Sequence, residues 1–154
     1  MPSLNRIACA VAMFGCLSSA FAADSAAGLI KNAKGTATVE RSSGKLPVRA
    51  GMEVLASDRI VTAGDGSVGI MLRDETMLSV GPNSSVSLDK FAFDPATHDG
   101  VLNASVKRGT MAVISGKLSK KSPDAVKFST PSAILGVRGT EFVIDAGQGS
   151  EEAK

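Results

Sequence analysis

The sequence has no tryptophan, no tyrosine and only one histidine, and these absences limit the chemistry that it can support. Any Ser–His–Asp arrangement would have to use His98, which lies in the polar segment 94–100, a composition typical of a solvated loop. Asp94, His98 and Asp99 match no standard zinc or calcium spacing, and the sequence contains no phosphate-binding or dinucleotide motif. We therefore predict that the protein is not an enzyme and has no catalytic residues, metal site or cofactor.

The two cysteines, Cys9 and Cys16, both lie near the N-terminus, in a segment with the properties of a signal peptide. Arg6 precedes an apolar run over residues 7–22 that ends in small residues suited to cleavage after Ala22. The run is shorter than the roughly 20 residues that a membrane-spanning helix needs, so an uncleaved anchor is the weaker interpretation. Cleavage would leave a periplasmic or secreted chain without cysteine, disulfide or transmembrane span.

Cys16 allows a second interpretation, because residues 13–16 faintly resemble the site at which bacterial lipoproteins are cut and acylated. Phe14 is bulky where a small residue is usual, and the apolar stretch between Arg6 and Cys16 is short for that pathway. A lipid anchor through Cys16 is therefore the less favoured alternative.

Neither sign of charge dominates the sequence, which has 17 lysines and arginines against 15 aspartates and glutamates. The one cluster of lysines, at Lys117, Lys120 and Lys121, lacks the aromatic or arginine-rich surroundings that nucleic-acid sites usually have. We expect this cluster to be a solvated loop, and we predict no nucleic-acid partner.

Beyond the leader, short apolar stretches alternate with turn-forming residues every several positions, which is typical of strands and turns. The clearest stretch is 67–73, in which Val68, Ile70 and Leu72 share one face. No window of a dozen residues keeps a helical spacing without Gly or Pro, so little more than one helical turn is expected. The sequence predicts an all-β domain of about ten short strands, and the turn spacing allows a sandwich, a small barrel or a short solenoid.

The predicted organisation has four parts. They are a signal-peptide helix at residues 1–22, a lead-in at 23–34, a compact β domain at 35–145 and a polar C-terminal tail at 146–154. Within the β domain, residues 111–114 are apolar without alternation, which predicts a strand covered on both sides. Residues 116–123 are predicted to form a longer turn.

The order of features over residues 35–144 resembles the extracytoplasmic FecR domain, named for the iron-dicitrate sensor of bacterial surface signalling. The most specific part is the block 128–142, with the sequence FSTPSAILGVRGTEF. We expect its motif residues to have a structural role; they are Pro131, Gly136, Arg138, Gly139 and Thr140.

Physical reasons support that structural role. Pro131 fixes its own φ and favours an extended residue before it. Gly136 and Gly139 are expected to allow positive φ or a close backbone approach around Arg138. The donors of Arg138 would then reach carbonyls or the carboxylate of Glu141 across the turn.

The chain departs from the family pattern in two places. Many members have Asp then Gly at the turn where this chain has Asp74 then Glu75. Because glutamate is unfavourable at positive φ, we expect a different turn type or a longer loop there. The iron-dicitrate sensor also has a cytoplasmic segment that binds a sigma factor, followed by a membrane helix, where this chain has only the predicted leader.

Met71 and Met77 flank that turn and fall opposite the apolar faces of their strands, where they would form either a second buried layer or a small exposed patch. The pair is the candidate contact surface. The resemblance implies an exported, non-enzymatic binding domain that recognises another cell-envelope or outer-membrane protein in a sensing or signalling context. The alternative is a module that binds cell-envelope glycan or serves as a structural envelope component. We rank a glycan site lower because such sites usually display aromatic platforms.

Overall fold

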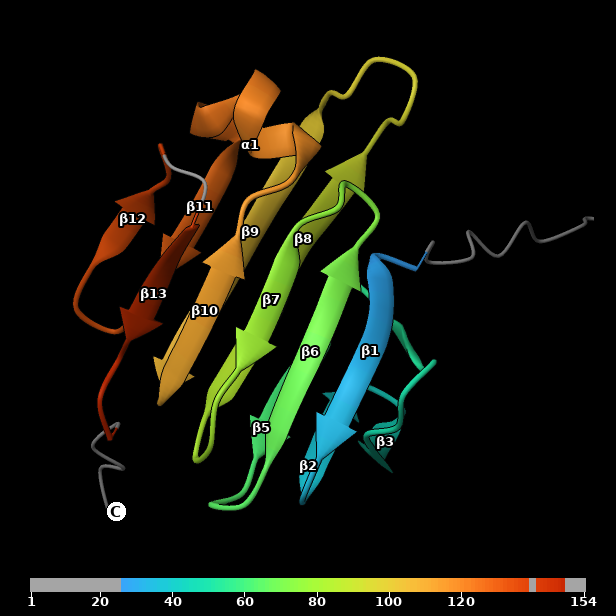
Figure 1. The fold of residues 1–154 in the computed structure, drawn as a ribbon, viewed down its shortest axis with the longest axis vertical. Coiled ribbons are helices and arrows are strands. Elements are labelled where there is room, and N and C mark those ends of the chain that lie inside the picture. Colours follow the sequence, from blue (N-terminus) through green and yellow to red (C-terminus); the bar gives the residue numbers. More distant parts are fainter. Residues whose placement is uncertain (1–25, 139–140, 149–154) are drawn as a thin grey trace, which may run out of the picture.

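The structure is a computed structural model that describes residues 26–138 and 141–148. In it, the short alternating stretches form two β-sheets that lie one in front of the other (Figure 1). The inner faces of both sheets supply one continuous set of buried apolar side chains. This confirms the predicted all-β fold, and a two-sheet sandwich is the architecture observed among those that the turn spacing allows.

The front sheet, sheet A, has six strands in the order β13-β10-β7-β6-β1-β4. Its strands are β1 (Gly28–Lys34), β4 (Glu53–Val54), β6 (Ser67–Leu72), β7 (Met77–Val80), β10 (Thr110–Ile114) and β13 (Glu141–Asp145). Every neighbouring pair in it is antiparallel. Strands that are distant in sequence, such as β1 and β6, therefore lie side by side (Figure 1).

The second sheet, sheet B, has seven strands in the order β12-β11-β9-β8-β5-β2-β3. Its strands are β2 (Ala37–Arg41), β3 (Gly44–Pro47), β5 (Arg59–Thr62), β8 (Ser85–Phe93), β9 (Gly100–Arg108), β11 (Val126–Ser129) and β12 (Ile134–Gly136). One pair, β9 with β11, is parallel. A parallel pair needs a long crossover, and here the crossover contains β10, the helix α1 (Lys117–Lys121) and the short 3-10 helix η1 (Pro123–Ala125).

The core of the sandwich follows from the alternation in its strands. In β6, Val68, Ile70 and Leu72 are almost completely buried, as the sequence pattern predicted. Phe128 of β11 is fully buried and meets the Phe142 ring of β13 edge-on, with 5.4 Å between ring centroids. Apolar packing between the two sheets is thus the main stabilising interaction of the described residues.

Strand β1 lies in the segment 23–34, for which the sequence predicted only a lead-in. It pairs with β4 on one side and β6 on the other, and its Ile30 is buried in the core. A register shift between Ile30 and Asn32 breaks the alternation, which explains why the pattern of this strand is hard to recognise. The boundaries of the predicted parts themselves stay a prediction.

The β6–β7 hairpin has a three-residue loop, because the Leu72 amide donates to the Thr76 carbonyl at 2.9 Å. A longer loop was one of the two alternatives that we expected here, but Glu75 has a φ of +68°, the conformation that we expected it to avoid. The buried Asp74 carboxylate accepts hydrogen bonds from the amide and hydroxyl of Thr76, at 3.1 and 2.6 Å. These bonds hold the loop and offset the roughly 1–2 kcal/mol that positive φ costs such a residue.

The predicted longer turn at 116–123 contains α1, the single helical turn that the sequence allowed. No helix among residues 26–138 and 141–148 has the length and apolar character needed to cross a membrane. The predicted signal peptide at 1–22, with Cys9 and Cys16, lies outside the described residues.

Candidate functional site

The two candidate contact residues, Met71 and Met77, are register partners on β6 and β7. Both belong to the outer face of sheet A, since the side chains next to them, Leu72 and Leu78, point into the core and are buried. Met71 is half-buried, whereas Met77 is exposed. The hairpin therefore brings the pair together at the surface, while the proposed contact with a partner stays a prediction.

The pair is the centre of a longer line of apolar side chains on sheet A. Leu29 of β1 is the register partner of Met71, and Ile114 of β10 is the register partner of Met77. The exposed fractions of Leu29, Met77 and Ile114 are 44%, 39% and 45%. We call Leu29, Met71, Met77 and Ile114 the apolar row; it crosses four neighbouring strands at right angles to their direction.

The position of Ile114 corrects the expectation that residues 111–114 form a strand covered on both sides. Met111 and Val113 of β10 are fully buried, but Ile114 is exposed and nothing in the described part of the chain covers it. An apolar strand of this kind is typical of a sheet whose second face is also packed. The uncovered outer face of β10 is thus the feature of sheet A that the sequence pattern does not account for within this chain.

An acidic residue lies at each end of the apolar row. Glu53 of β4 is the register partner of Leu29, and Glu141 of β13 is the register partner of Ile114. Both carboxylates are exposed, and neither has an ion pair among the described residues. With about 4.8 Å between adjacent strands, the two glutamates are about 24 Å apart across the sheet.

The surface beside the row is low and slightly hollowed. The next register line along the strands has small residues at its centre, with Gly69 opposite Ser79 and Ser79 opposite Ala112. It has larger ones at its ends, with Asn32 opposite Gly69 and the exposed Val143 opposite Ala112. At the β1 end, a shallow hollow of about 280 Å³ has mainly apolar walls that include Leu29 and Met71. The large side chains of the apolar row therefore project beyond the small residues beside them. A partner could fill the space above these small residues.

The outer face of sheet B has the opposite character. A polar row crosses it in register: Glu40, Arg59, Ser87 and Ser105 are successive partners on β2, β5, β8 and β9. The Glu40 carboxylate pairs with Lys45 at 2.7 Å, and this hydrogen bond lowers its pKa. Arg59 Nε donates to Ser87 Oγ at 3.3 Å.

The polar row continues across the same face of sheet B to β11. The Ser105 hydroxyl donates to Asp89, and its oxygen lies 2.8 Å from Ser129 Oγ on β11. A hollow of about 320 Å³ lies over this face and has mostly polar walls, among them Arg59, Ser87 and Asp89. Because these groups are already partners of one another, the polar row is best explained as surface structure.

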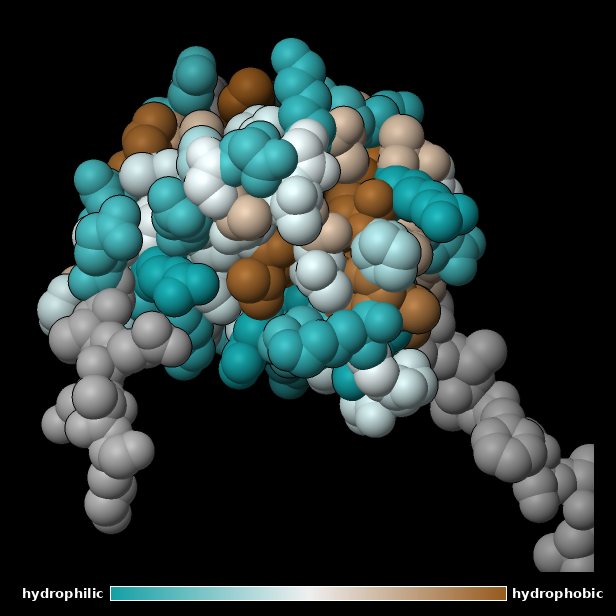
Figure 2. All heavy atoms as spheres, turned by 90° about the horizontal axis from the view of Figure 1, so that it is seen from below, coloured by the Kyte–Doolittle hydropathy of each residue, from teal (hydrophilic) through white to brown (hydrophobic). Residues whose placement is uncertain are grey.

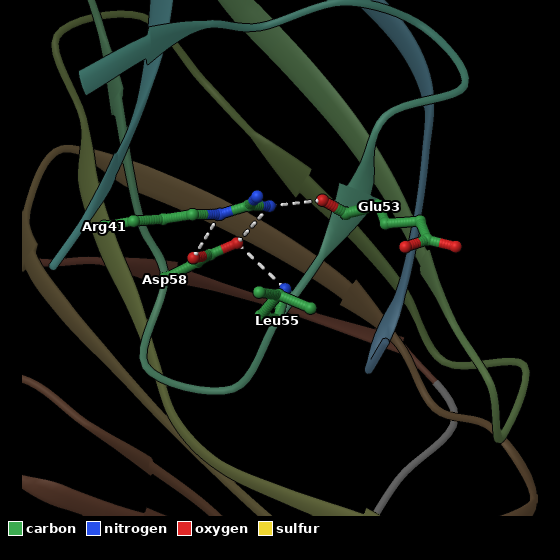
Figure 3. A network of polar contacts seen from close by, with 4 residues as sticks. All are labelled: Arg41, Glu53, Leu55 and Asp58. Atoms are coloured by element: carbon green, nitrogen blue, oxygen red, sulfur yellow. Dashed lines mark hydrogen bonds and ion pairs between the residues drawn. The ribbon is translucent and has the colours of Figure 1, made fainter. Parts of the chain in front are cut away.

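A partly buried ion pair connects the two sheets beside the Glu53 end of the apolar row (Figure 3). Arg41 of β2 makes two hydrogen bonds with the Asp58 carboxylate, at 2.8 and 2.9 Å, and a third with the Glu53 carbonyl at 2.6 Å. Asp58 is 2% exposed and also accepts a bond from the Leu55 amide at 2.8 Å. This pair, which the sequence did not reveal, fixes β4 and therefore the backbone that carries Glu53.

The motif residues near the C-terminus occupy the edge of sheet B. Pro131 and Gly136 are exposed, and Gly136 has neither a positive φ nor an atom within 4 Å of an added Cβ, so the reason expected for this glycine is not observed. Arg138 is exposed and makes no ion pair with Glu141. Gly139 and Thr140 lie outside the described residues, and the structural role of the motif stays a prediction.

His98 lies in a surface loop between β8 and β9, with its ring stacked on Phe93 at 6.0 Å between centroids. Asp99 of the same loop pairs with Lys121 at 2.9 Å, and the hydrogen bond from this lysine lowers the pKa of Asp99. Within residues 26–138 and 141–148, no group of three or more His, Cys, Asp or Glu side chains is arranged to hold a metal ion.

Figure 2 shows the sandwich from below, where hydrophobic residues reach the surface in separate patches among hydrophilic ones. The apolar row differs from such patches because strand register aligns its members across four strands. The most exposed large apolar side chains, Ile134 of β12 and Val143 of β13, lie outside the row, so the row is the candidate functional surface because of its alignment and not because of its exposure.

Comparison with protein families matches residues 58–153 to the family described as FecR protein. The match covers more than half of the chain and includes every strand from β5 to β13. The chain belongs to the FecR family. No curated protein and no solved structure matches it. FecR is a regulatory and sensor family, so membership suggests a role related to sensing or signalling.

The FecR match begins at Asp58, the buried partner of Arg41. The strands before it are still part of the same fold, because β2 pairs with β5 and β1 lies between β4 and β6. Two residues at the β1 end of the apolar row, Leu29 and Glu53, therefore lie outside the matched region.

Proposed function

We propose that the protein is an exported, non-enzymatic FecR-family module that binds another protein of the cell envelope through the apolar row of sheet A. The observation that carries this proposal is the alignment of Leu29, Met71, Met77 and Ile114 on an uncovered sheet face. FecR domains act outside the cytoplasm in their family, which agrees with the signal peptide predicted at residues 1–22.

The energetic argument rests on apolar burial. Complete burial of a Leu, Ile or Met side chain contributes about 1.5–3 kcal/mol, and each exposed member of the row still has roughly half of that available. A partner that covers Leu29, Met77 and Ile114 would thus gain about 3 kcal/mol from these side chains. The small residues Ser79 and Ala112 beside the row would let a complementary surface approach closely.

Charge selects the kind of partner. In a face-to-face dimer of two copies, the row meets either itself or its reverse, and in both arrangements a glutamate from Glu53 or Glu141 faces another glutamate. A partner with an apolar strip between lysine or arginine residues would instead pair with both carboxylates. We therefore commit to a different protein with a basic-flanked apolar strip as the occupant.

The direct test is site-specific photo-crosslinking. A photoreactive residue replaces Ser79, which is exposed on β7 next to the row. We expect it to capture one protein from envelope fractions, and we expect Met77→Asp in the same chain to reduce that capture at least about tenfold. A matched control has the photoreactive residue at Lys127, which is exposed on the outer face of sheet B.

Equal capture from Ser79 and Lys127, or capture that Met77→Asp does not reduce, would refute binding through the row. A crosslinked second copy of the chain would contradict the charge argument. Recovery with peptidoglycan sacculi that is independent of Met77 would favour the glycan alternative instead.

A further inference from the structure

The methionines of the described residues differ sharply in access to solvent. Met111 of β10 is 0% exposed, and Met52 packs against the core. Met71 is half-buried and Met77 is 39% exposed. Since oxidation of methionine follows exposure, oxidants reach Met77 of the apolar row first, Met71 and the equally half-buried Met52 next, and Met111 last.

The pair lies where oxidation would disturb binding through the apolar row. Met71 and Met77 are direct cross-strand partners and occupy the two central places of the row, between Leu29 and Ile114. A sulfoxide replaces a soft apolar sulfur with a strongly polar S–O group. An oxygen at either place would interrupt the apolar strip at its centre, where a partner would have to bury it without a hydrogen-bond donor.

Cysteine, the other sulfur-containing residue type, is absent from the predicted mature chain. Cys9 and Cys16 both fall in the predicted signal peptide, so methionine would be the only sulfur-containing residue type of the mature protein. No thiol would then compete with these thioethers for an oxidant. The compartment predicted for the mature chain is also an oxidising one.

We propose that Met71 and Met77 form a reversible methionine-sulfoxide site that releases the partner from the apolar row when the envelope meets peroxide or hypochlorous acid. The release step rests on the proposed function, whereas the modification does not. With hydrogen peroxide, the thioether sulfur attacks one oxygen and the O–O bond breaks. The products are one sulfoxide and one water, so sulfur loses two electrons and peroxide gains two. Two methionine sulfoxide reductases, one for each epimer of the sulfoxide, reverse the step with electrons from a dithiol.

The modification is tested on the purified protein by treatment with hydrogen peroxide and peptide mapping by mass spectrometry. We expect Met77 to gain one oxygen first, the half-buried Met71 and Met52 more slowly, and Met111 at least about tenfold more slowly than Met77 because it is buried. Circular dichroism should not change, since the side chains of Met71 and Met77 lie outside the core. Oxidation of Met71 and Met77 at the rate of Met111 would overturn the proposal.

The release step is tested with the photoreactive residue at Ser79. The purified protein is oxidised, the peroxide is quenched with free methionine, and untreated envelope fractions are then added. We expect capture to fall at least about tenfold and to return after treatment with both reductases. Met71→Leu combined with Met77→Leu keeps the apolar row without its sulfurs, so capture by this variant should resist peroxide.

The matched control combines Met52→Leu with Met111→Leu. Oxidation should reduce capture by this variant as much as it reduces capture by the chain without substitutions. Loss of capture in the Met71→Leu/Met77→Leu variant to the same extent would overturn the release step. A complete lack of capture before oxidation would refute the proposed function instead, and the mass-spectrometric result would still decide whether the sulfoxide site exists.

Discussion

The outer faces of the two sheets have the same geometry but opposite chemistry. On each, strand register aligns one side chain per strand, in the apolar row of sheet A and in the polar row of sheet B. In the polar row, Glu40, Arg59 and Ser105 find partners within the face itself. In the apolar row, Ile114 and Met77 remain exposed. Within the described residues, the side chains of the polar row are thus partners of one another, whereas nothing covers the apolar row; sheet B has exposed large apolar side chains only on its edge strands, at Leu46, Ile134 and Leu135.

The largest expected effect tests whether the two faces are structurally independent. Asp58→Ala leaves the partly buried Arg41 guanidinium without its carboxylate and removes the acceptor of the Leu55 amide, next to β4. We expect the free energy of unfolding to fall by about 3 kcal/mol in urea denaturation. Glu40→Gln, at a more exposed ion pair, should cost less than about 0.5 kcal/mol. Similar losses in both variants would show that Asp58 does not connect the sheets as proposed.

The next effect contrasts binding on the two faces. Met77→Asp places a charge in the middle of the apolar row, so partner capture should fall at least about tenfold, equivalent to about 1.4 kcal/mol. Stability should change by less than about 0.5 kcal/mol, because Met77 is exposed. Lys127→Asp is the matched change on sheet B and should leave capture intact, as measured by crosslinking from Ser79. A similar loss in both variants would remove the contrast between the faces.

A smaller effect concerns the polar row. Ser105→Ala removes the hydroxyl that connects Asp89 with Ser129, so we expect a loss of about 1 kcal/mol in the free energy of unfolding. Partner capture should not change, because Ser105 faces away from sheet A. If Ser105→Ala weakened capture as strongly as Met77→Asp, sheet B would have a binding role that we do not assign to it.

The smallest effect is a pH dependence of sheet B. The hydrogen bond with Lys45 lowers the pKa of Glu40 in the folded protein, so this pair contributes fully above the ordinary value of 4.5. The contribution is lost as the pH falls below 4.5 and through the lowered pKa. We expect no more than about 0.5 kcal/mol, because water screens the exposed Lys45. Unfolding curves above and below this range, with Lys45→Met as the comparison, measure it; an equal pH dependence in Lys45→Met would assign the effect to other carboxylates.

Parts of the fold are predictable from local pattern. The alternation of Val68, Ile70 and Leu72 predicts β6 and its buried face, and the observed strand agrees. Strand β1 was missed because a register shift after Ile30 interrupts its alternation. The positive φ of Glu75 was unexpected because the hydrogen bonds that hold it, between Asp74 and Thr76, depend on the side chains of its neighbours.

For the candidate site, the sequence identified Met71 and Met77 because both flank one turn and oppose the apolar faces of their strands. Leu29 and Ile114 could not be found in this way, since they become neighbours of the pair only through pairing of β1 with β6 and of β10 with β7. The same is true of Glu53 and Glu141, whose places at the ends of the row depend on the order of strands in sheet A.

The sequence by itself determined that this protein is built from short strands, which side of each clear strand faces the core, and that it resembles the FecR domain. Only the tertiary structure decided which outward side chains meet. The reason is that facing alternates with a period of two residues along one strand and is therefore local. Register and strand order, in contrast, join segments such as Leu29 and Met71 through backbone hydrogen bonds between distant parts of the chain.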